Sequence, residues 1–502
     1  MKLISQTTNT ARTTIVVAGA QLLAALTGGV FALLVVVILG QSERADAFLA
    51  AYSAYLLLLL FGSTMRVALI PQFGTTDDPE RFLETARRRV GEVIPVGLLL
   101  GLVFVSLAPV LGPLLMHGAG DDAKYTASVS FALLGIAGMC QIWSAILASV
   151  LGAARRFVAS ALFYLAASIA MVALASLLMH LYGPTGAALG VLASAALLLL
   201  AHIVYLWRLG FTAPLRIAPV ISAHAWLATA KVSAAAVIPI VFQINLTVSI
   251  AFLSGEAGLV SAYVYAYLAT VTIVGVTAAV VSTVTLPNLI AGLERDGSNV
   301  RVPYLTETAA FGTYAFVPVA LGFACFGKPL ADAVLGGSMT PEVLDFFWDA
   351  ARIFLVMGLI WAVFAPLVSI ALAEHRYRLM ALAATFVVPL HVVLLLLVSR
   401  QNELAVAVAQ SIAGSTVSLL LLLALFRGQS LKVLWAVVLA TWPCLLLAAA
   451  FVVPAALLDI TTLAESVAAI TACAIAYFGV GTLVWPSAGR RIVVLLRGNP
   501  AT

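Results

Sequence analysis

The chain consists of long apolar segments joined by short polar ones. A helix crosses a bilayer core of about 30 Å in about 20 residues. Runs such as LLLLLF and LLLLLALF do not alternate apolar and polar positions as barrel strands do. The pattern therefore predicts an all-α polytopic membrane protein with fourteen transmembrane helices. The expected spans are 14–40, 47–71, 93–116, 126–152, 158–181, 185–207, 227–253, 257–290, 306–326, 350–373, 379–399, 404–426, 433–454 and 463–486.

The composition excludes a soluble protein. Of the 502 residues, 63% are hydrophobic and 9% are charged, and the mean hydropathy is +1.13. So few charged residues cannot cover the surface of a water-soluble fold. The remaining solvent for the apolar surface is lipid.

The distribution of Lys and Arg predicts the orientation of the spans. Of the 26 basic residues, 20 lie in the two termini and in the connections that an even number of spans places on the same side. Four lie in the opposite connections, and Arg66 and Arg352 lie within spans or at their edges. Both termini are therefore expected to be cytoplasmic. The basic surplus is a topology signal, and no nucleic-acid partner is expected.

Similar segments recur along the chain. VALIPQF (67–73) and VTLPNLI (284–290) each close an apolar run, so Pro71 and Pro287 are expected to end their helices. Further matches recur at an offset of 220, as in AARRF (153–157) and AEHRY (373–377). We expect two pseudo-twofold-related six-helix lobes, 1–209 and 210–430, followed by a helix pair and cytoplasmic tail in 431–502. Repeated halves are typical of secondary transporters with alternating access.

The sequence contains no motif typical of a metal site, a disulfide framework or a catalytic site. The four cysteines lie in apolar runs without CxxC spacing, so neither disulfides nor a metal site are expected. There is no GxSxG, P-loop or HExxH motif. We therefore expect a protein that is not an enzyme, binds no cofactor and does not hydrolyse ATP.

Four segments resemble the lipid II flippases of the MurJ/MviN family. They are ADAFLAAYSAYLLLLLFGSTMRVALIPQF (45–73), IPIVFQINL (238–246), VGVTAAVVSTVTLPNL (274–289) and FVPVALGFACFGKPLADAVLGGSMTPE (316–342). The resemblance implies the multidrug/oligosaccharidyl-lipid/polysaccharide exporter superfamily and a lipid-linked substrate. It also implies the bacterial cytoplasmic membrane, with membrane lipids and envelope-synthesis enzymes as partners of a monomeric protein.

The sequence departs from the family at its cavity arginines. The expected first span, 14–40, carries no charge. Alignment on the two prolines places Leu57 and Leu58 at the positions of the second-helix pair, Leu268 at that of the eighth-helix arginine and Tyr267 at that of its acidic neighbour. A diphosphate needs charge-assisted donors once it leaves water. Either other basic residues replace these arginines or the cargo is not lipid II.

Ionisable residues in spans are the first candidates for a site, because burying them in lipid is costly. Arg66 and Arg352 are candidate anion ligands, although Arg66 could also extend to the interface. Asp46 and Asp349 are candidate gating or coupling carboxylates. Asp46 also fits a helix N-terminal acid, and Asp349 with Arg352 fits a structural ion pair at i, i+3.

Three uncharged residues in spans are candidates for binding sugar hydroxyls: Gln243, Asn245 and Gln141. Such side chains also hold helices together by hydrogen bonds within a bundle. The sequence thus favours a flippase or exporter of a lipid-linked glycan. A cation-coupled drug or metabolite exporter and a non-transporting scaffold for envelope synthesis are the alternatives.

Overall fold

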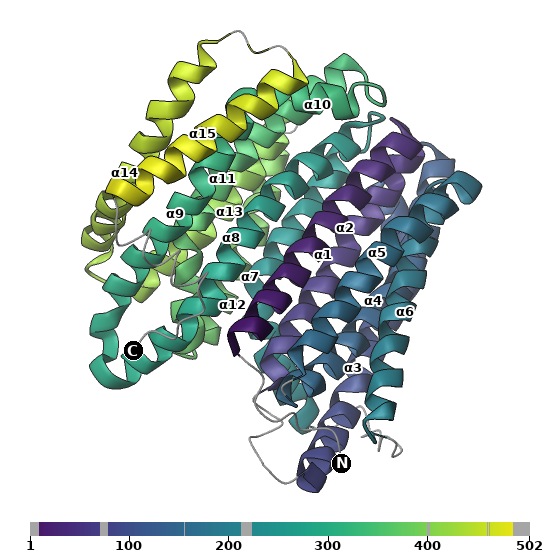
Figure 1. Cartoon of the computed structure of the whole chain (residues 1–502). Helices are drawn as coiled ribbons and strands as arrows, with labels where there is room; N and C mark the ends of the chain where they lie inside the picture. The colour runs from purple at the N-terminus through teal and green to yellow at the C-terminus, as the bar shows by residue number, and fades with distance from the viewer. Residues whose placement is uncertain are drawn as a thin grey trace. The chain divides into compact units, whose positions relative to one another are not determined.

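The computed structural model describes residues 10–70, 79–154, 156–211, 223–398, 402–458, 460 and 462–484. Regular structure in these ranges is helical, as Figure 1 shows. The helices are α1 (Thr10–Leu39), α2 (Glu43–Leu69), α3 (Pro79–Leu115), α4 (Asp121–Ala153), α5 (Phe157–Tyr182), α6 (Pro184–Arg208), α7 (Ala223–Leu253), α8 (Leu259–Asp296), α9 (Arg301–Phe326), α10 (Lys328–Leu335), α11 (Pro341–Ala373), α12 (Tyr377–Val398), α13 (Leu404–Leu425), α14 (Ser430–Ala456) and α15 (Leu463–Val484). A 3₁₀ turn, η2 (Gly297–Val300), joins α8 to α9.

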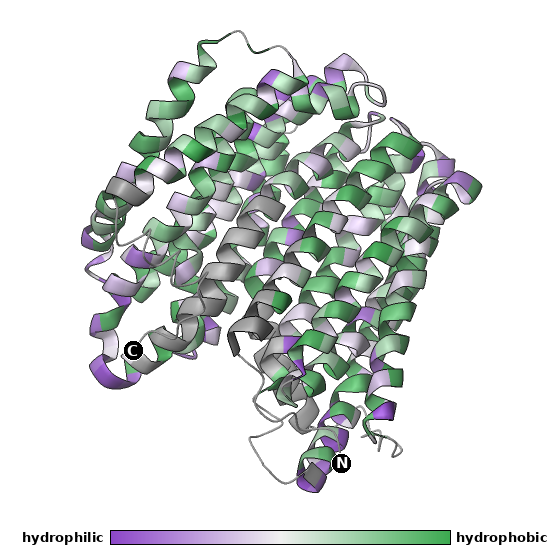
Figure 2. Cartoon of the chain, in the orientation of Figure 1, coloured by the Kyte–Doolittle hydropathy of each residue, from purple (hydrophilic) through white to green (hydrophobic). Residues whose placement is uncertain are grey.

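Each predicted span corresponds to one long helix, which confirms the all-α membrane fold. By length and composition, 11 helices of the described chain are able to cross a membrane, and shorter apolar stretches lie in α1, α7 and α8. Hydrophilic residues gather toward the helix ends (Figure 2). The sequence missed α10, because its eight residues are too few to span a bilayer.

Three helix ends differ from the prediction. Helix α2 ends at Leu69, just before Pro71, which lies outside the described residues. Helix α8 continues to Asp296, so the prediction that Pro287 ends it is wrong. Helix α1 begins at Thr10 and therefore includes Arg12, so the first helix is not free of charge.

Several corresponding helices in the two halves begin at residue numbers that differ by the same offset. Helices α4 and α11 begin at Asp121 and Pro341 and end at Ala153 and Ala373, each 220 residues apart. Helices α5 and α12, and likewise α6 and α13, begin at the same offset. The pairs α3–α4, α4–α6 and α5–α6 pack together, and so do their counterparts α9–α11, α11–α13 and α12–α13. This agreement supports an internal repeat.

By internal contacts the chain divides into two compact units, Met1–Ser261 and Ala262–Thr502. The boundary falls inside α8 and assigns α7 to the first unit, against α2. The compact units are defined by contacts, whereas the predicted lobes are defined by the sequence repeat, so the two divisions need not coincide. The lobe bounds 1–209 and 210–430 therefore remain a prediction.

The first unit is centred on α2 and α4, which pack along each other. Their apolar faces join those of α3 and α6 in one core that includes Phe61, Met65, Ile146 and Val150. Helices α5 and α6 approach closely, because a Cβ on Gly190 would lie 2.4 Å from the Ala175 Cα atom. Small residues permit this contact between membrane helices.

The second unit is centred on α9 and α11, with the C-terminal helices α14 and α15 packed on α9. Tyr314 of α9 and Tyr477 of α15 are each 1% exposed and lie with ring centroids 5.1 Å apart. The α9–α10 segment is interrupted at Gly327, whereas its counterpart α3 passes through Pro109 without a break.

Candidate functional site

A buried carboxylate ties the start of α2 to the α7–α8 connection. Asp46 is 1% exposed and accepts hydrogen bonds from the backbone N–H groups of Gly258, at 2.6 Å, and Ser261, at 2.8 Å. The Ser261 hydroxyl donates a further bond to the same carboxylate. Because Ser261 lies in the first turn of α8, Asp46 caps that helix from another helix. The geometry therefore agrees with the helix-terminus role, applied to α8.

Neighbouring contacts extend this connection across the same end of the first unit. The Gln41 side chain donates to the carbonyl of Ala257, at 2.9 Å, and Glu43 accepts from the N–H of Gly120, at 2.9 Å. The α3–α4 turn passes so close that a Cβ on Gly118 would lie 2.7 Å from the Gly255 Cα atom. Three chain segments are thus held together around Asp46.

Arg66 lies near the other end of α2 and is partly buried. Its guanidinium carbon lies 4.9 Å from the centre of the Tyr164 ring, a cation–π contact with α5. Tyr164 in turn packs on His202 of α6, with ring centroids 5.8 Å apart. In the described part of the chain, no carboxylate forms an ion pair with Arg66. The Arg66 guanidinium contacts Tyr164 both at its ring and through a side-chain hydrogen bond.

Sequence reasoning missed the residues around Arg66. His202 is fully buried, its Nδ1 lies 2.9 Å from the Leu198 carbonyl oxygen, and its Nε2 lies 3.4 Å from the Ser160 hydroxyl. A carbonyl accepts only, so Nδ1 carries the proton and Nε2 accepts from Ser160. The only signal in the sequence was a polar residue inside the expected span 185–207.

The three uncharged candidates have different surroundings. Gln243 donates to the carbonyl of Ser53 at 2.7 Å and so joins α7 to α2. Gln141 of α4 hydrogen-bonds the Tyr55 hydroxyl of α2. Asn245 is 1% exposed, and neither polar atom of its side chain has a hydrogen-bond partner among the residues that the structure describes. Gln243 and Gln141 therefore connect helices, whereas the amide of Asn245 is unused.

Arg352 and Asp349 lie in the second unit, on α11. Their side chains are about half exposed, and Arg352 Nη1 lies 3.7 Å from Asp349 Oδ1, as an i, i+3 pair. The Arg352 guanidinium also lies 5.0 Å from the Trp348 ring centre, and its Nε donates to the Ala324 carbonyl at 3.3 Å. An exposed pair of this kind stabilises little. The expected ion pair is present.

The comparisons with known proteins identify the family. The family model "Lipid II flippase MurJ" matches residues 35–477. The chain belongs to the lipid II flippase MurJ family. A solved MurJ structure, in an inward closed conformation, is 19% identical, with a TM-score of 0.74 over 94% of this chain and 99% of that one. No curated protein matches the chain.

The fold is also shared with solved transporters of other names. The eukaryotic MATE transporter AtDTX14 is 15% identical, with a TM-score of 0.59 over 86% of this chain and 99% of that one. A MOP superfamily transporter from Pyrococcus furiosus is 13% identical, with a TM-score of 0.53 over 87% of this chain and 99% of its own. At this identity the likeness establishes the fold alone.

The positions at which the resemblance places charged cavity residues are uncharged and packed in this chain: Leu58 is one of the second-helix pair, and Tyr267 stands at the acidic position beside the eighth-helix arginine position. Leu58 is 3% exposed, and its side chain fits so closely on α4 that a Cβ on Gly138 would lie 2.2 Å from it. Tyr267 is also 3% exposed and packs on Phe354 with ring centroids 5.6 Å apart. Neither residue offers an anion a charged donor. Arg66 is the cation that α2 supplies inside the first unit.

Proposed function

We propose that the protein flips a lipid-linked glycan from the inner to the outer leaflet of the bacterial cytoplasmic membrane. The match to the MurJ family over residues 35–477 carries this proposal. A polar head group cannot cross hydrocarbon without losing its hydration, so the protein has to provide polar contacts on the way. The lipid tail remains in the bilayer, and alternating access moves the head group.

Arg66 is proposed as the anion ligand of the first unit. Its guanidinium has no carboxylate partner among the described residues, and Tyr164 holds it in place. An arginine without a carboxylate partner keeps its charge for an anion, and a guanidinium group binds phosphate oxygens in a bidentate manner. This residue would take the place of the family arginines that are Leu57, Leu58 and Leu268 here. Arg352 is proposed as a second ligand, which would give up its ion pair with Asp349 when it binds the anion.

Asp46 is proposed as the gating residue. Its hydrogen bonds reach Ser261, the last residue of the first compact unit. The Asp46 carboxylate would hold the start of α8 against the start of α2, within the first unit. Asp349, paired with Arg352, would be a coupling carboxylate of the second unit.

Flipping by purified protein in vesicles tests this function. The substrate is a fluorescent lipid-linked disaccharide diphosphate, and the readout is the amount accessible to an enzyme added outside. Arg66→Ala is expected to lower the rate at least about tenfold, since a charge-assisted bond contributes about 1.5–3 kcal/mol. Arg208→Ala is the matched control, because Arg208 is exposed at the end of α6. Equal rates for the two variants would remove Arg66 from the site.

Two other outcomes would change the assignment. The apolar residues Leu57, Leu58 and Leu268 favour an exporter of drugs or small metabolites as the second candidate. Export of a soluble dye driven by a proton or sodium gradient, without lipid flipping, would establish that candidate. Neither activity in a folded protein that binds envelope-synthesis enzymes would establish a scaffold.

A further inference from the structure

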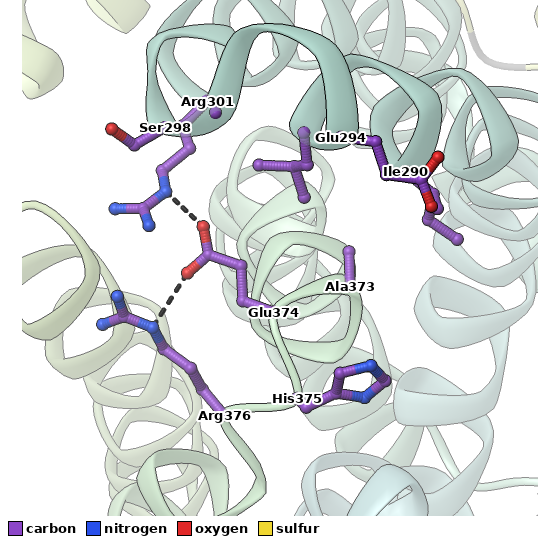
Figure 3. Close-up of a pocket in the computed structure, with 10 residues that line it drawn as sticks. Ile290, Glu294, Ser298, Arg301, Ala373, Glu374, His375 and Arg376 are labelled. Carbon is purple, nitrogen blue, oxygen red and sulfur yellow. Dashed lines mark hydrogen bonds and ion pairs between the residues drawn. The ribbon is translucent and has the colours of Figure 1, made fainter.

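The second unit contains an open cavity with a volume of about 560 Å³. It lies between the α8–α9 connection and the turn after α11, as Figure 3 shows. The charged and polar side chains that line it include Ser298, Arg301, Glu374, His375 and Arg376. Both connections belong to the side where the Lys and Arg distribution predicts the cytoplasm. The volume is that of a small-ligand site.

The Glu374 carboxylate contacts two arginines, Arg301 and Arg376. Its Oε1 accepts from Nε of Arg301, and its Oε2 lies 2.8 Å from Nε of Arg376. The Glu374 side chain is 10% exposed, and those of Arg301 and Arg376 are 19% and 39% exposed. Both contacts involve the Nε atoms, that of Arg301 as a hydrogen bond and that of Arg376 as an ion pair, and the terminal Nη groups of the two arginines lie on the same side of the carboxylate (Figure 3).

The backbone fixes Glu374 and Arg376 on either side of a tight turn. The N–H of Arg376 donates to the Ala371 carbonyl at 2.8 Å, and that of His375 donates to the Leu372 carbonyl at 3.0 Å. These two bonds form a Schellman motif at the end of α11. His375 occupies its left-handed position, with φ of +55°. A histidine at a position that favours glycine is strained, and such strain concentrates at functional sites.

Glu374 contacts both guanidinium groups, and Glu294, the other carboxylate that lines the cavity, forms no ion pair with either of them among the described residues. Arg301 Nη1 makes one long contact, 3.5 Å from the Leu425 carbonyl oxygen. In the described residues, no other acceptor is bonded to the remaining Nη atoms of Arg301 and Arg376. Arg301 and Arg376 line the same cavity as Ser298 and its hydroxyl. A guanidinium group binds phosphate oxygens in a bidentate manner, so this set of donors suits a phosphate group.

We propose that Arg301 and Arg376, positioned by Glu374, form a binding site for a phosphate group. The ligand class is a phosphate ester or diphosphate, from an anionic lipid head group or from a soluble phosphorylated molecule. The site lies within the second unit and uses none of the residues proposed above for cargo or gating. It therefore goes beyond the flipping activity and does not depend on it.

Binding to the purified full-length protein tests the proposal in two experiments. In the first, native mass spectrometry compares retention of phosphatidylglycerol and phosphatidylcholine. In the second, protein in phosphatidylcholine nanodiscs is titrated with inorganic pyrophosphate. The variants are Arg376→Gln, Arg376→Lys and the control Arg378→Gln. Arg378 is exposed, lies two residues away and does not line the cavity.

We expect Arg376→Gln to weaken anion binding at least about tenfold relative to Arg378→Gln, since the bonds lost are charge-assisted. Arg376→Lys preserves a charge beside Glu374, so the fold is kept, but it removes the fork and should also weaken binding. A loss confined to phosphatidylglycerol assigns the site to a lipid head group. A loss confined to pyrophosphate assigns it to a soluble phosphorylated ligand. Equal binding by all variants in both experiments would overturn the proposal.

Discussion

Asp46 of α2 accepts a hydrogen bond from the backbone N–H of Ser261, 215 residues further along the chain and 2.8 Å away. This contact, with those to Gly258 and to the Ser261 hydroxyl, gives the buried carboxylate three donors. A buried charge persists when its hydrogen bonds are satisfied in this way. The start of α8 is therefore fixed to the start of α2.

Asp46→Asn should destabilise the protein. An amide nitrogen would face one of the N–H donors, and a charge-assisted bond contributes about 1.5–3 kcal/mol. The unfolding temperature in nanodiscs, measured by intrinsic fluorescence, should fall. Asp122→Asn is the control, because Asp122 pairs with Arg44 at the surface and its side chain is 81% exposed. If both variants unfold at the same temperature, Asp46 does not hold α8.

Gly190→Ala should loosen the contact between α5 and α6. The new methyl group would lie 2.4 Å from the Ala175 Cα and 2.6 Å from its Cβ, so one helix must shift. Overpacking of this kind costs about 1–3 kcal/mol. In contrast, Gly29→Ala in α1 has no atom within 4 Å of its new methyl group and should not destabilise. Thermal unfolding of the two variants checks this, and a stable Gly190→Ala protein would contradict the close packing.

Asn245→Leu should preserve stability while it lowers flipping. Both polar atoms of the buried Asn245 side chain lack partners, so their removal loses no hydrogen bond. Gln243→Leu, on the same helix, loses the bond to the Ser53 carbonyl and should cost about 0.6 kcal/mol. Unfolding temperature and flipping rate are measured for both. Unchanged flipping by Asn245→Leu would remove that residue from the proposed substrate site.

His375→Gly should leave stability equal or up to about 1 kcal/mol higher, because glycine adopts positive φ without steric cost. His375→Val should lower stability, since a β-branched residue fits that conformation poorly. The comparison is made by thermal unfolding. A stability loss in His375→Gly would mean that the contact between His375 Nδ1 and the Tyr377 hydroxyl, at 3.2 Å, contributes more than the turn.

Hydrophobic patterning predicted the helices because crossing lipid is a local requirement on each segment. The repeat was also visible, since α4 and α11 end at Ala153 and Ala373, the first residues of AARRF and AEHRY. Partners far apart in sequence were not visible: nothing in the pattern relates Asp46 to Ser261. Arg301 contributed only to the count of basic residues, and Arg376 only to that count and to the repeat, because their convergence on Glu374 depends on how α9 and α11 pack.

The interruption at Gly327 distinguishes the two halves mechanically. Prolines occupy the matching positions Pro109 and Pro329 in both halves, yet α3 runs on over that stretch while α9 ends at Phe326 and α10 begins at Lys328. A continuous helix resists bending along its length, whereas two helices joined at one residue bend at the junction. We therefore expect bending of the α9–α10 segment in the second unit to occur at Gly327.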